Sequence, residues 1–442
     1  MLISLLLLVE GAKAAYNASF IASITNLLDT LLDNYDAKLR PDHARGVTVV
    51  TVHMSVLNIG PVSEKDMEFT MDCYFRQSWY DERLRYDGPL PQLLLASKVL
   101  KELWHPDTYV RNGRQSYLHT LTVPNILLRV YTDGLVYVSQ RLTIRTRCPM
   151  YLKKFPMDTQ ICPVKIGSLG YSSSEVVYHW KTVSVNQNID LSQYQINSFF
   201  WNERNISDPR NMLDAPLSTL ETYFELERQQ GFYILQIYTP CSLIVVMSWV
   251  SFWINKEASP ARVGLGVMTV LTMSTLGLGG RDDLPRVTYS TALDIYIVTC
   301  FAFVFASLVE YALINFAYML IVNKRRRDIR ERNGVAYPER KRTRMMHSAF
   351  SASSLIGQDP VVVFLISYLS QPFMLATVQY DGTWETFAKN LHNVGRIDSI
   401  AKVLFPLSYS LFNLFYWISF LYIIPDEIHE HLDVPLSSRR HP

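Results

Sequence analysis

The sequence PARVGLGVMTVLTMSTLGLGGR, residues 260–281, decides how the rest of this chain is interpreted. A helix of this length, at about 1.5 Å per residue, crosses a bilayer core of about 30 Å. Five residues recur at alternating spacings of four and three and so share one helical face. These are Gly264, Met268, Leu271, Thr275 and Leu278. Threonine and serine hydroxyls lie beside that face, and an arginine lies near each end of the run.

Two interpretations fit this run. A helix that touches water on one side and protein on the other has this mixture of apolar residues and hydroxyls, which favours a pore-lining helix. The alternative is a buried helix whose small residues allow close packing against its neighbours. A single helix cannot enclose a channel, so the pore interpretation also requires an oligomer.

Composition and charge narrow the class of protein. The chain has 442 residues, of which 49% are hydrophobic, and this is enough for two or three folded regions. Its net charge of +2 gives no strong attraction to nucleic acid. The sequence contains no nucleophile–base arrangement, metal-ligand spacing or phosphate-binding loop. We therefore expect no enzyme, no cofactor, no metal site and no nucleic-acid partner.

Four runs are long and apolar enough to span a lipid bilayer. They are residues 233–254, 260–281, 295–322 and 403–424. The basic run at 323–344 is cytoplasmic by the positive-inside rule, which places the part of the chain before the first span outside the cell. We therefore predict an extracellular domain (15–230), three spans (231–322), a cytoplasmic loop (323–400), a fourth span (401–424) and an extracellular tail (425–442). A further apolar run at 360–378 would reverse the side of the tail if it crossed the membrane.

The N-terminus resembles a secretory signal peptide over residues 1–14. An apolar run is followed by an Ala-Lys-Ala triplet, although the basic start of such signals is missing. The alternative is a first helix. If the segment is cleaved, Asn17 and Asn205 lie outside the cell, and each begins an Asn-X-Ser acceptor for glycosylation. Apolar residues at helical spacing then predict a short amphipathic helix within 18–35.

Runs of β-branched and aromatic residues predict strands between 47 and 224. Turn dipeptides separate these runs at Gly60-Pro61, Gly88-Pro89, Asn112-Gly113 and Asp133-Gly134. Short strands at regular spacing indicate an all-β sandwich. Thirteen residues separate Cys148 from Cys162, and an extracellular location favours a disulfide between them. The alternative is two unrelated buried thiols.

Several motifs together resemble one family. A Cys-x13-Cys loop that holds Phe-Pro-X-Asp precedes four apolar runs, the second of which begins with Pro-Ala-Arg, and Trp-His-Pro-Asp stands at 104–107. This combination resembles the Cys-loop receptors, which are pentameric ligand-gated ion channels, over nearly the whole chain. LTMSTL and WVSFWINKEASPAR resemble the γ-aminobutyric acid (GABA) type A branch. FRQSWYDERL is similar to its alpha and gamma types more than to its beta type.

The resemblance implies an α+β membrane protein of the plasma membrane, with an extracellular β-sandwich, a four-helix transmembrane bundle and a pentameric assembly at synapses. It also implies an agonist site between subunits. The complementary-face positions are intact, at Tyr74, Arg76, Arg129 and Ser139. On the principal face Tyr109 matches the family. Leu169 and Leu217, however, replace aromatic residues there, and Gly167 replaces an acid.

We therefore expect a subunit of a GABA-gated chloride channel that supplies the complementary half of the agonist site. A beta-like subunit would supply the other half. One alternative is an anion channel opened by glycine, histamine or protons, and another is a modulatory or assembly subunit without its own agonist site. For Arg76 and Arg129 themselves, the alternative is that they are solvated strand residues.

The same resemblance implies residues for the pore and for its coupling to the ligand. The pore positions are Ala261, Arg262, Gly264, Met268, Leu271 and Thr275. Arg262 lies at the cytoplasmic N-terminus of the pore helix, where the helix dipole adds to its charge. Rings of arginine favour anions, which predicts chloride passage, with a membrane-edge anchor as the alternative. Leu271 is the expected gate. The coupling charges are Asp66, Asp158, Arg228 and Arg286, with ordinary surface charges as the alternative.

Overall fold

The computed structural model describes residues 20–33, 35–43, 45–187, 189, 191–207, 215–254, 258–279, 287–332 and 394–425. The chain divides into two compact units, described separately below. The first comprises Met1–Leu235, Gly280–Ile295 and Ile418–Pro442, and the second comprises Gln236–Gly279 and Tyr296–Trp417. Several predictions fall outside the described residues: the signal peptide, Asn17, Arg281, Arg286, the 360–378 run and the tail beyond Pro425.

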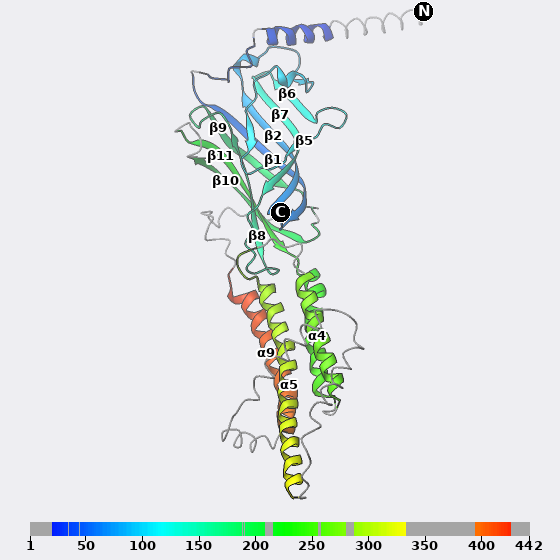
Figure 1. Cartoon of the computed structure of the whole chain (residues 1–442). Coiled ribbons are helices and arrows are strands. Elements are labelled where there is room, and N and C mark those ends of the chain that lie inside the picture. The colour runs from blue at the N-terminus through cyan, green and yellow to red at the C-terminus, as the bar shows by residue number, and fades with distance from the viewer. Residues whose placement is uncertain are drawn as a thin grey trace, which may run out of the picture. The chain divides into compact units, whose positions relative to one another are not determined.

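The described residues of the first unit form two β-sheets, preceded by a helix over residues 20–33 (Figure 1). The first sheet has the order β3-β6-β7-β2-β1-β9, with β5 beside β7. Its strands are β1 (Thr48–Ser63), β2 (Glu68–Tyr80), β3 (Gln92–Leu95), β5 (Tyr117–Leu118), β6 (Ile126–Tyr131), β7 (Leu135–Arg147) and β9 (Val176–Val185). The second sheet has the order β10-β11-β8-β4. Its strands are β4 (Thr108–Val110), β8 (Thr159–Ser168), β10 (Tyr194–Ile206) and β11 (Leu217–Arg228).

Alternating burial explains why these strands form a sandwich. In β1 the side chains of Val50, Val52 and Met54 are buried, and the residues between them are exposed or half-buried. Since successive side chains of a strand point to opposite faces, one face of β1 lies in the core and the other is free for polar residues. The predicted all-β domain with a short N-terminal helix is confirmed.

One predicted turn is wrong. Gly60-Pro61 does not end a strand, because β1 continues through it to Ser63. The pairing of β1 with β2 shifts register between Ile59 and Val62, which marks an irregularity at this dipeptide. Proline has no N–H to donate to the ladder, and such an irregularity is where a strand tolerates it.

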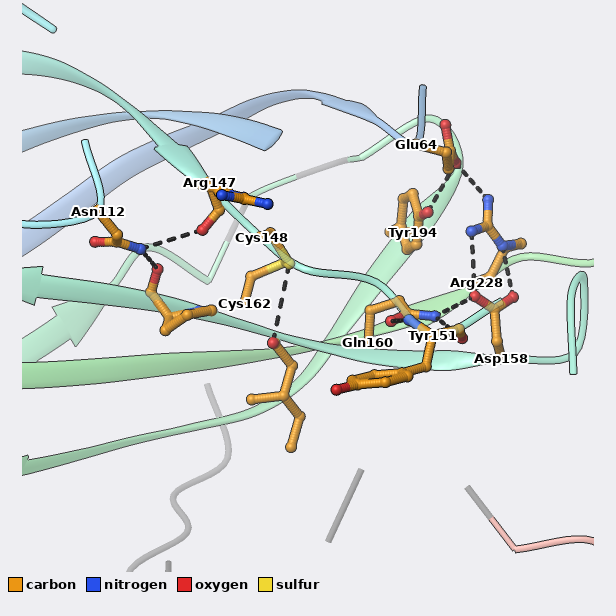
Figure 2. The surroundings of a disulfide bond; sticks show 12 residues. Glu64, Asn112, Arg147, Cys148, Tyr151, Asp158, Gln160, Cys162, Tyr194 and Arg228 are labelled. Atoms are coloured by element: carbon orange, nitrogen blue, oxygen red, sulfur yellow. Dashed lines mark hydrogen bonds and ion pairs between the residues drawn. A yellow bond between two sulfur atoms is a disulfide. The ribbon is translucent and has the colours of Figure 1, made fainter. Parts of the chain in front are cut away.

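The predicted disulfide between Cys148 and Cys162 is present, and its surroundings are drawn in Figure 2. Cys148 directly follows β7 of the first sheet, and Cys162 lies on β8 of the second. The bond therefore ties the two sheets together at the base of the loop that connects them. The other three cysteines, Cys73, Cys241 and Cys300, are free and buried, as expected for packing residues.

The second unit is helical. Its helices are α3 (Thr239–Trp249), α4 (Ser259–Gly279), most of α5 (Ala292–Arg332) and most of α9 (Val394–Ile418), and α2 (Gly231–Tyr233) lies just before it in the chain. Figure 1 shows α5 and α9 side by side, and the rings of Tyr296 and Phe412 pack 6.0 Å apart between them. Helix α5 continues to Arg332, beyond the predicted end of the third span.

Within the described residues, three helical segments are long and apolar enough to cross a membrane. They are Gly231–Phe252, Ala292–Leu320 and Ser399–Ile423, which overlap the first, third and fourth predicted spans. Helix α4 covers the second predicted span but is not one of these three. Helix α4 is rich in threonine, serine and glycine.

Candidate ligand groove and pore helix

A groove of about 570 Å³ lies on the outer face of the first sheet, over strands β2, β6 and β7. Its polar lining residues are Tyr74, Arg76, Arg129, Tyr137, Ser139 and Arg141, and the segment 123–127 forms its rim. The strand register explains the grouping, because Arg76 pairs with Ser139 and Tyr74 pairs with Arg141. Four of the five predicted ligand residues therefore line one groove.

The groove is rich in arginine. The guanidinium carbon of Arg76 lies 5.5 Å from the ring centre of Tyr74, whose side chain is partly exposed. The Nε atoms of Arg129 and Arg141 are buried and have no hydrogen-bond partner among the described residues. None of the groove-lining residues of the described chain is acidic. Three arginines with no acid beside them in the lining make this surface suited to an anionic group.

Arg141 and Tyr137 were not among the predicted site residues. A sequence signal for them exists, because residues 137, 139 and 141 alternate along β7 and point to the same side as Ser139. Extending the prediction by two residues in each direction from Ser139 would have found both.

The fifth predicted ligand residue, Tyr109, lies elsewhere. It is on β4 of the second sheet, opposite Gly167 of β8, and does not line the groove. The turn after β8 is held by the carboxylate of Asp107, which accepts hydrogen bonds from the Ser168 hydroxyl and from two backbone N–H groups. That turn leaves Leu169 63% exposed at its tip.

The predicted complementary-face positions thus lie on the first sheet, and the predicted principal-face positions lie on the second. Tyr109, Leu169 and Leu217 all belong to the second sheet or to the turn after one of its strands. Of the two leucines, Leu169 is exposed and Leu217, on β11, is buried. An exposed leucine offers no π-face to an ammonium group, unlike an aromatic residue at the same place. At the position of Leu169, the second sheet therefore offers no ring to a cationic group.

A second arginine site lies at the base of the first unit, beside the disulfide loop (Figure 2). The side chain of Arg228, at the end of β11, has no exposed area. Its Nε donates to Asp158 Oδ1 at 2.8 Å, a second nitrogen donates to Asp158 Oδ2 at 3.2 Å, and the third pairs with Glu64. Burial alone would lower the pKa of Arg228, but the Asp158 and Glu64 carboxylates outweigh it and raise that pKa.

Only some of the predicted coupling residues lie at this site. Arg228 and Asp158 come together, but Asp66 lies on an exposed turn and accepts a hydrogen bond from Ser63 at 3.0 Å. Glu64, which was not predicted, takes the second position against Arg228 and also accepts from the Tyr194 hydroxyl at 2.7 Å. In the sequence, the only signal for this role of Glu64 is its position two residues before Asp66, on the turn after β1.

The segment after α4 contacts the disulfide loop within the first unit. The Leu152 N–H donates to the Tyr289 hydroxyl at 2.9 Å, and the Ala292 N–H donates to the Lys153 carbonyl at 2.8 Å. These bonds join the start of α5 to the same loop that carries Asp158. The loop therefore connects the buried arginine with the chain between α4 and α5.

Helix α4 has one exposed face and one packed face. Four of the predicted pore positions are exposed, namely Ala261, Gly264, Met268 and Thr275. Leu271 is half-buried. The opposite face packs closely: a Cβ atom on Gly266 would lie 2.6 Å from a methyl carbon of Leu308 on α5. The small residue Gly266 thus serves packing on one face of α4, as the second sequence interpretation expects, while the other face is exposed in this chain.

Arg262 does not lie on the exposed stripe. It is only 2% exposed, its Nε donates to the Ile254 carbonyl at 2.8 Å, and its guanidinium carbon lies 5.5 Å from the Tyr311 ring. The charge of Arg262 therefore lies within the packed side of α4, and its predicted role in ion selection stays a prediction. Helical geometry accounts for this placement, since two residues before Gly264 is more than half a turn around the helix.

Comparison with known proteins gives matches to both units. Residues 24–230 match the neurotransmitter-gated ion-channel ligand binding domain, and residues 237–353 match the neurotransmitter-gated ion-channel transmembrane region. Human gamma-aminobutyric acid receptor subunit alpha-3 is 36% identical over 426 residues, which cover 91% of this chain and 85% of the relative. Chicken subunit gamma-4 is 38% identical over 413 residues, covering 90% and 89%. Bovine subunit alpha-2 is 36% identical over 422 residues, covering 91% and 89%.

Proposed function

Because this chain belongs to the family of neurotransmitter-gated ion channels, we propose that it is one subunit of a GABA-gated anion channel. The family is one of channels rather than enzymes, and its members named above are GABA receptor subunits of the alpha and gamma types. The observation that carries the proposal is the arginine-rich groove on the first sheet.

The chemistry of the groove suits one end of GABA. A guanidinium group binds a carboxylate through charge-assisted hydrogen bonds, which can be bidentate. Arg76 and Arg129 come from neighbouring parts of the same face, and the Ser139 hydroxyl lies between their strands as a further donor. The carboxylate of GABA therefore binds here.

The ammonium end of GABA needs a different surface. The groove lining holds no acid among the described residues, and three arginines would repel a cation. The positive end must therefore be held by another chain, one with aromatic and acidic residues at the positions of Leu169 and Gly167. A beta-like subunit of the same family is the partner that we propose, in a heteropentamer at the plasma membrane and at synapses.

The pore is proposed to be lined by the exposed face of α4, from Ala261 through Gly264 and Met268 to Thr275. Chloride is the proposed ion, because the N-terminal end of a helix carries partial positive charge. The buried Arg262 adds a full positive charge at the same end, although its side chain does not enter the stripe. Leu271 remains the proposed gate. Asn205 is exposed and is the proposed glycosylation site in the described residues.

Co-expression tests this function. The full chain is expressed in oocytes alone and with a beta-type GABA receptor subunit, and currents are recorded with GABA, glycine and histamine. We expect a GABA-evoked current that reverses at the chloride potential with the partner, and only a small GABA response from the chain alone. Large GABA currents from the chain alone, or glycine as the better agonist, would contradict the assignment.

Ion selectivity is tested separately in the same cells. Replacing the Pro260-Ala261 pair with a single glutamate places a ring of negative charge at the inner end of α4. The reversal potential should then move toward that of cations. An unchanged reversal potential, with the variant present at the cell surface, would argue against this end of α4 as the selectivity region.

A further inference from the structure

His53 lies behind the arginine that faces the groove. It is on β1, directly opposite Arg76 of β2 in the strand pairing. One guanidinium nitrogen of Arg76 is 3.3 Å from His53 Nδ1 and 3.4 Å from Nε2. A nitrogen nearly equidistant from both ring nitrogens lies over the face of the imidazole rather than along one lone pair. His53 itself is half-buried and is not one of the residues that line the groove.

The Arg76 guanidinium is therefore close to two rings, that of His53 and that of Tyr74. An arginine side chain has several rotatable bonds, and fixing it for a ligand costs conformational entropy. A neighbour that already fixes the guanidinium lowers that cost. Contacts of this kind raise affinity without touching the ligand.

We propose that His53 is a positioning residue for the agonist groove, whose neutral imidazole holds Arg76 in place and whose protonation releases it. This inference rests on the proposed function, in which Arg76 binds the agonist carboxylate. A neutral ring attracts the guanidinium through its face or accepts a hydrogen bond from it, whereas an imidazolium ion can do neither and repels it.

The surroundings of His53 favour the neutral ring at physiological pH. The charged groups that act on it are Arg76 from β2 and Lys181 from β9, and both are cations. Its direct partners in the pairing with β9 include Thr182, which is uncharged. Partial burial, followed by Arg76 and Lys181, lowers the pKa of His53 below its ordinary value.

The direction of the pH effect follows. Because that pKa lies below about 6.5, the ordinary value for histidine, His53 is neutral at pH 7 and gains a proton only as the pH falls further. The new positive charge then acts on Arg76 at contact distance, while the agonist carboxylate lies farther away on the groove side. Repulsion of Arg76 outweighs attraction of the ligand, so agonist affinity falls on acidification.

The test is a set of concentration–response curves for GABA, recorded from the full chain co-expressed with a beta-type subunit. His53→Ala should raise the half-maximal concentration roughly five- to tenfold near neutral pH and leave the maximal current unchanged, as expected for the loss of a partly buried contact between a cation and a ring. His53→Asn keeps a neutral polar side chain that does not titrate but has no ring face, so its half-maximal concentration near neutral pH should lie between those of His53→Ala and the unmodified chain. Surface labelling of each variant confirms that the receptor reaches the membrane.

The pH dependence distinguishes positioning from a general structural role. As the pH falls from about 7.4 to well below 6.5, the ordinary histidine value, the half-maximal concentration of the unmodified chain should rise several-fold, because His53 gains its proton there. The His53→Asn variant should show little of that rise. His179→Asn is the matched control, since His179 is also half-exposed on the same sheet but pairs with Glu203 instead. Its pH response should equal that of the unmodified chain.

A double-mutant cycle completes the test. In an Arg76→Ala background, His53→Ala should have no further effect, because the group that it positions is gone. Equal effects of His53→Ala with and without Arg76 would overturn the inference, as would identical pH responses of His53→Asn and the unmodified chain. In either case a GABA current from the unmodified pair leaves the proposed function standing. The absence of any GABA current from that pair overturns both.

Discussion

The two arginine sites of the ligand-binding domain differ in how completely their charges are matched. Arg228 has no exposed area and donates to two carboxylates, Asp158 and Glu64. In the groove, Arg129 and Arg141 each keep a buried Nε without a hydrogen-bond partner among the described residues. A buried charge with all its partners is part of the fold. The groove has three arginines and no acid among its lining residues in the described chain, so its arginines can pair with an anionic ligand.

Removing an arginine should also have different consequences at the two sites. Removing one member of a buried ion pair leaves the other charges buried without a partner. Removing an arginine from an open groove leaves water free to enter in its place. Substitutions at the first site should therefore act on folding and assembly, and substitutions at the second on agonist concentration.

The largest effect is expected for Arg228→Ala. Loss of this arginine leaves Asp158 and Glu64 facing each other at the base of the domain, at a cost of about 3–5 kcal/mol for breaking a buried pair. Surface labelling of the co-expressed receptor should fall to a small fraction of normal. Arg45→Ala is the control, because the Arg45–Glu82 pair is exposed on both sides and contributes little. Normal surface levels of Arg228→Ala would remove the distinction between the two sites.

A smaller and different effect is expected for Arg129→Ala. The variant should reach the cell surface normally, but its half-maximal GABA concentration should rise roughly tenfold or more, since a hydrogen bond to a charged group contributes about 1.5–3 kcal/mol. Concentration–response recording and surface labelling on the same cells measure both quantities. A loss of surface receptor comparable to that of Arg228→Ala would mean that Arg129 is structural.

The contrast between the sites also shows what a sequence can predict. Alternation along β2 places Tyr74 and Arg76 on one face, and the family resemblance supplied Arg129 and Ser139, so together they identified most of the groove. The disulfide and the sandwich followed from spacing and residue type. Such features depend on near neighbours in the chain and on the class of each residue.

Contacts between distant strands were harder to predict. Glu64 and His53 acquire their roles only through pairing partners that are far away in sequence, Arg228 and Arg76. The burial of Arg262 was equally hard to predict, because it depends on the contacts with Ile254 and Tyr311. In each case the missing information was which neighbour the side chain meets across the fold.

The finest test of the comparison uses two aspartates predicted together as coupling residues. Asp158→Asn weakens the buried site and should reduce surface receptor in the same way as Arg228→Ala, although less severely. Asp66→Asn removes an exposed charge, so its effect on stability should stay within about 0.5 kcal/mol. If Asp66 couples the ligand domain to the pore, its variant should still raise the half-maximal GABA concentration by roughly threefold, which is less than 1 kcal/mol. A reduced surface level for Asp66→Asn, or a GABA response equal to that of the unmodified chain, would place Asp66 outside the coupling region and leave Glu64 as the acid that acts there.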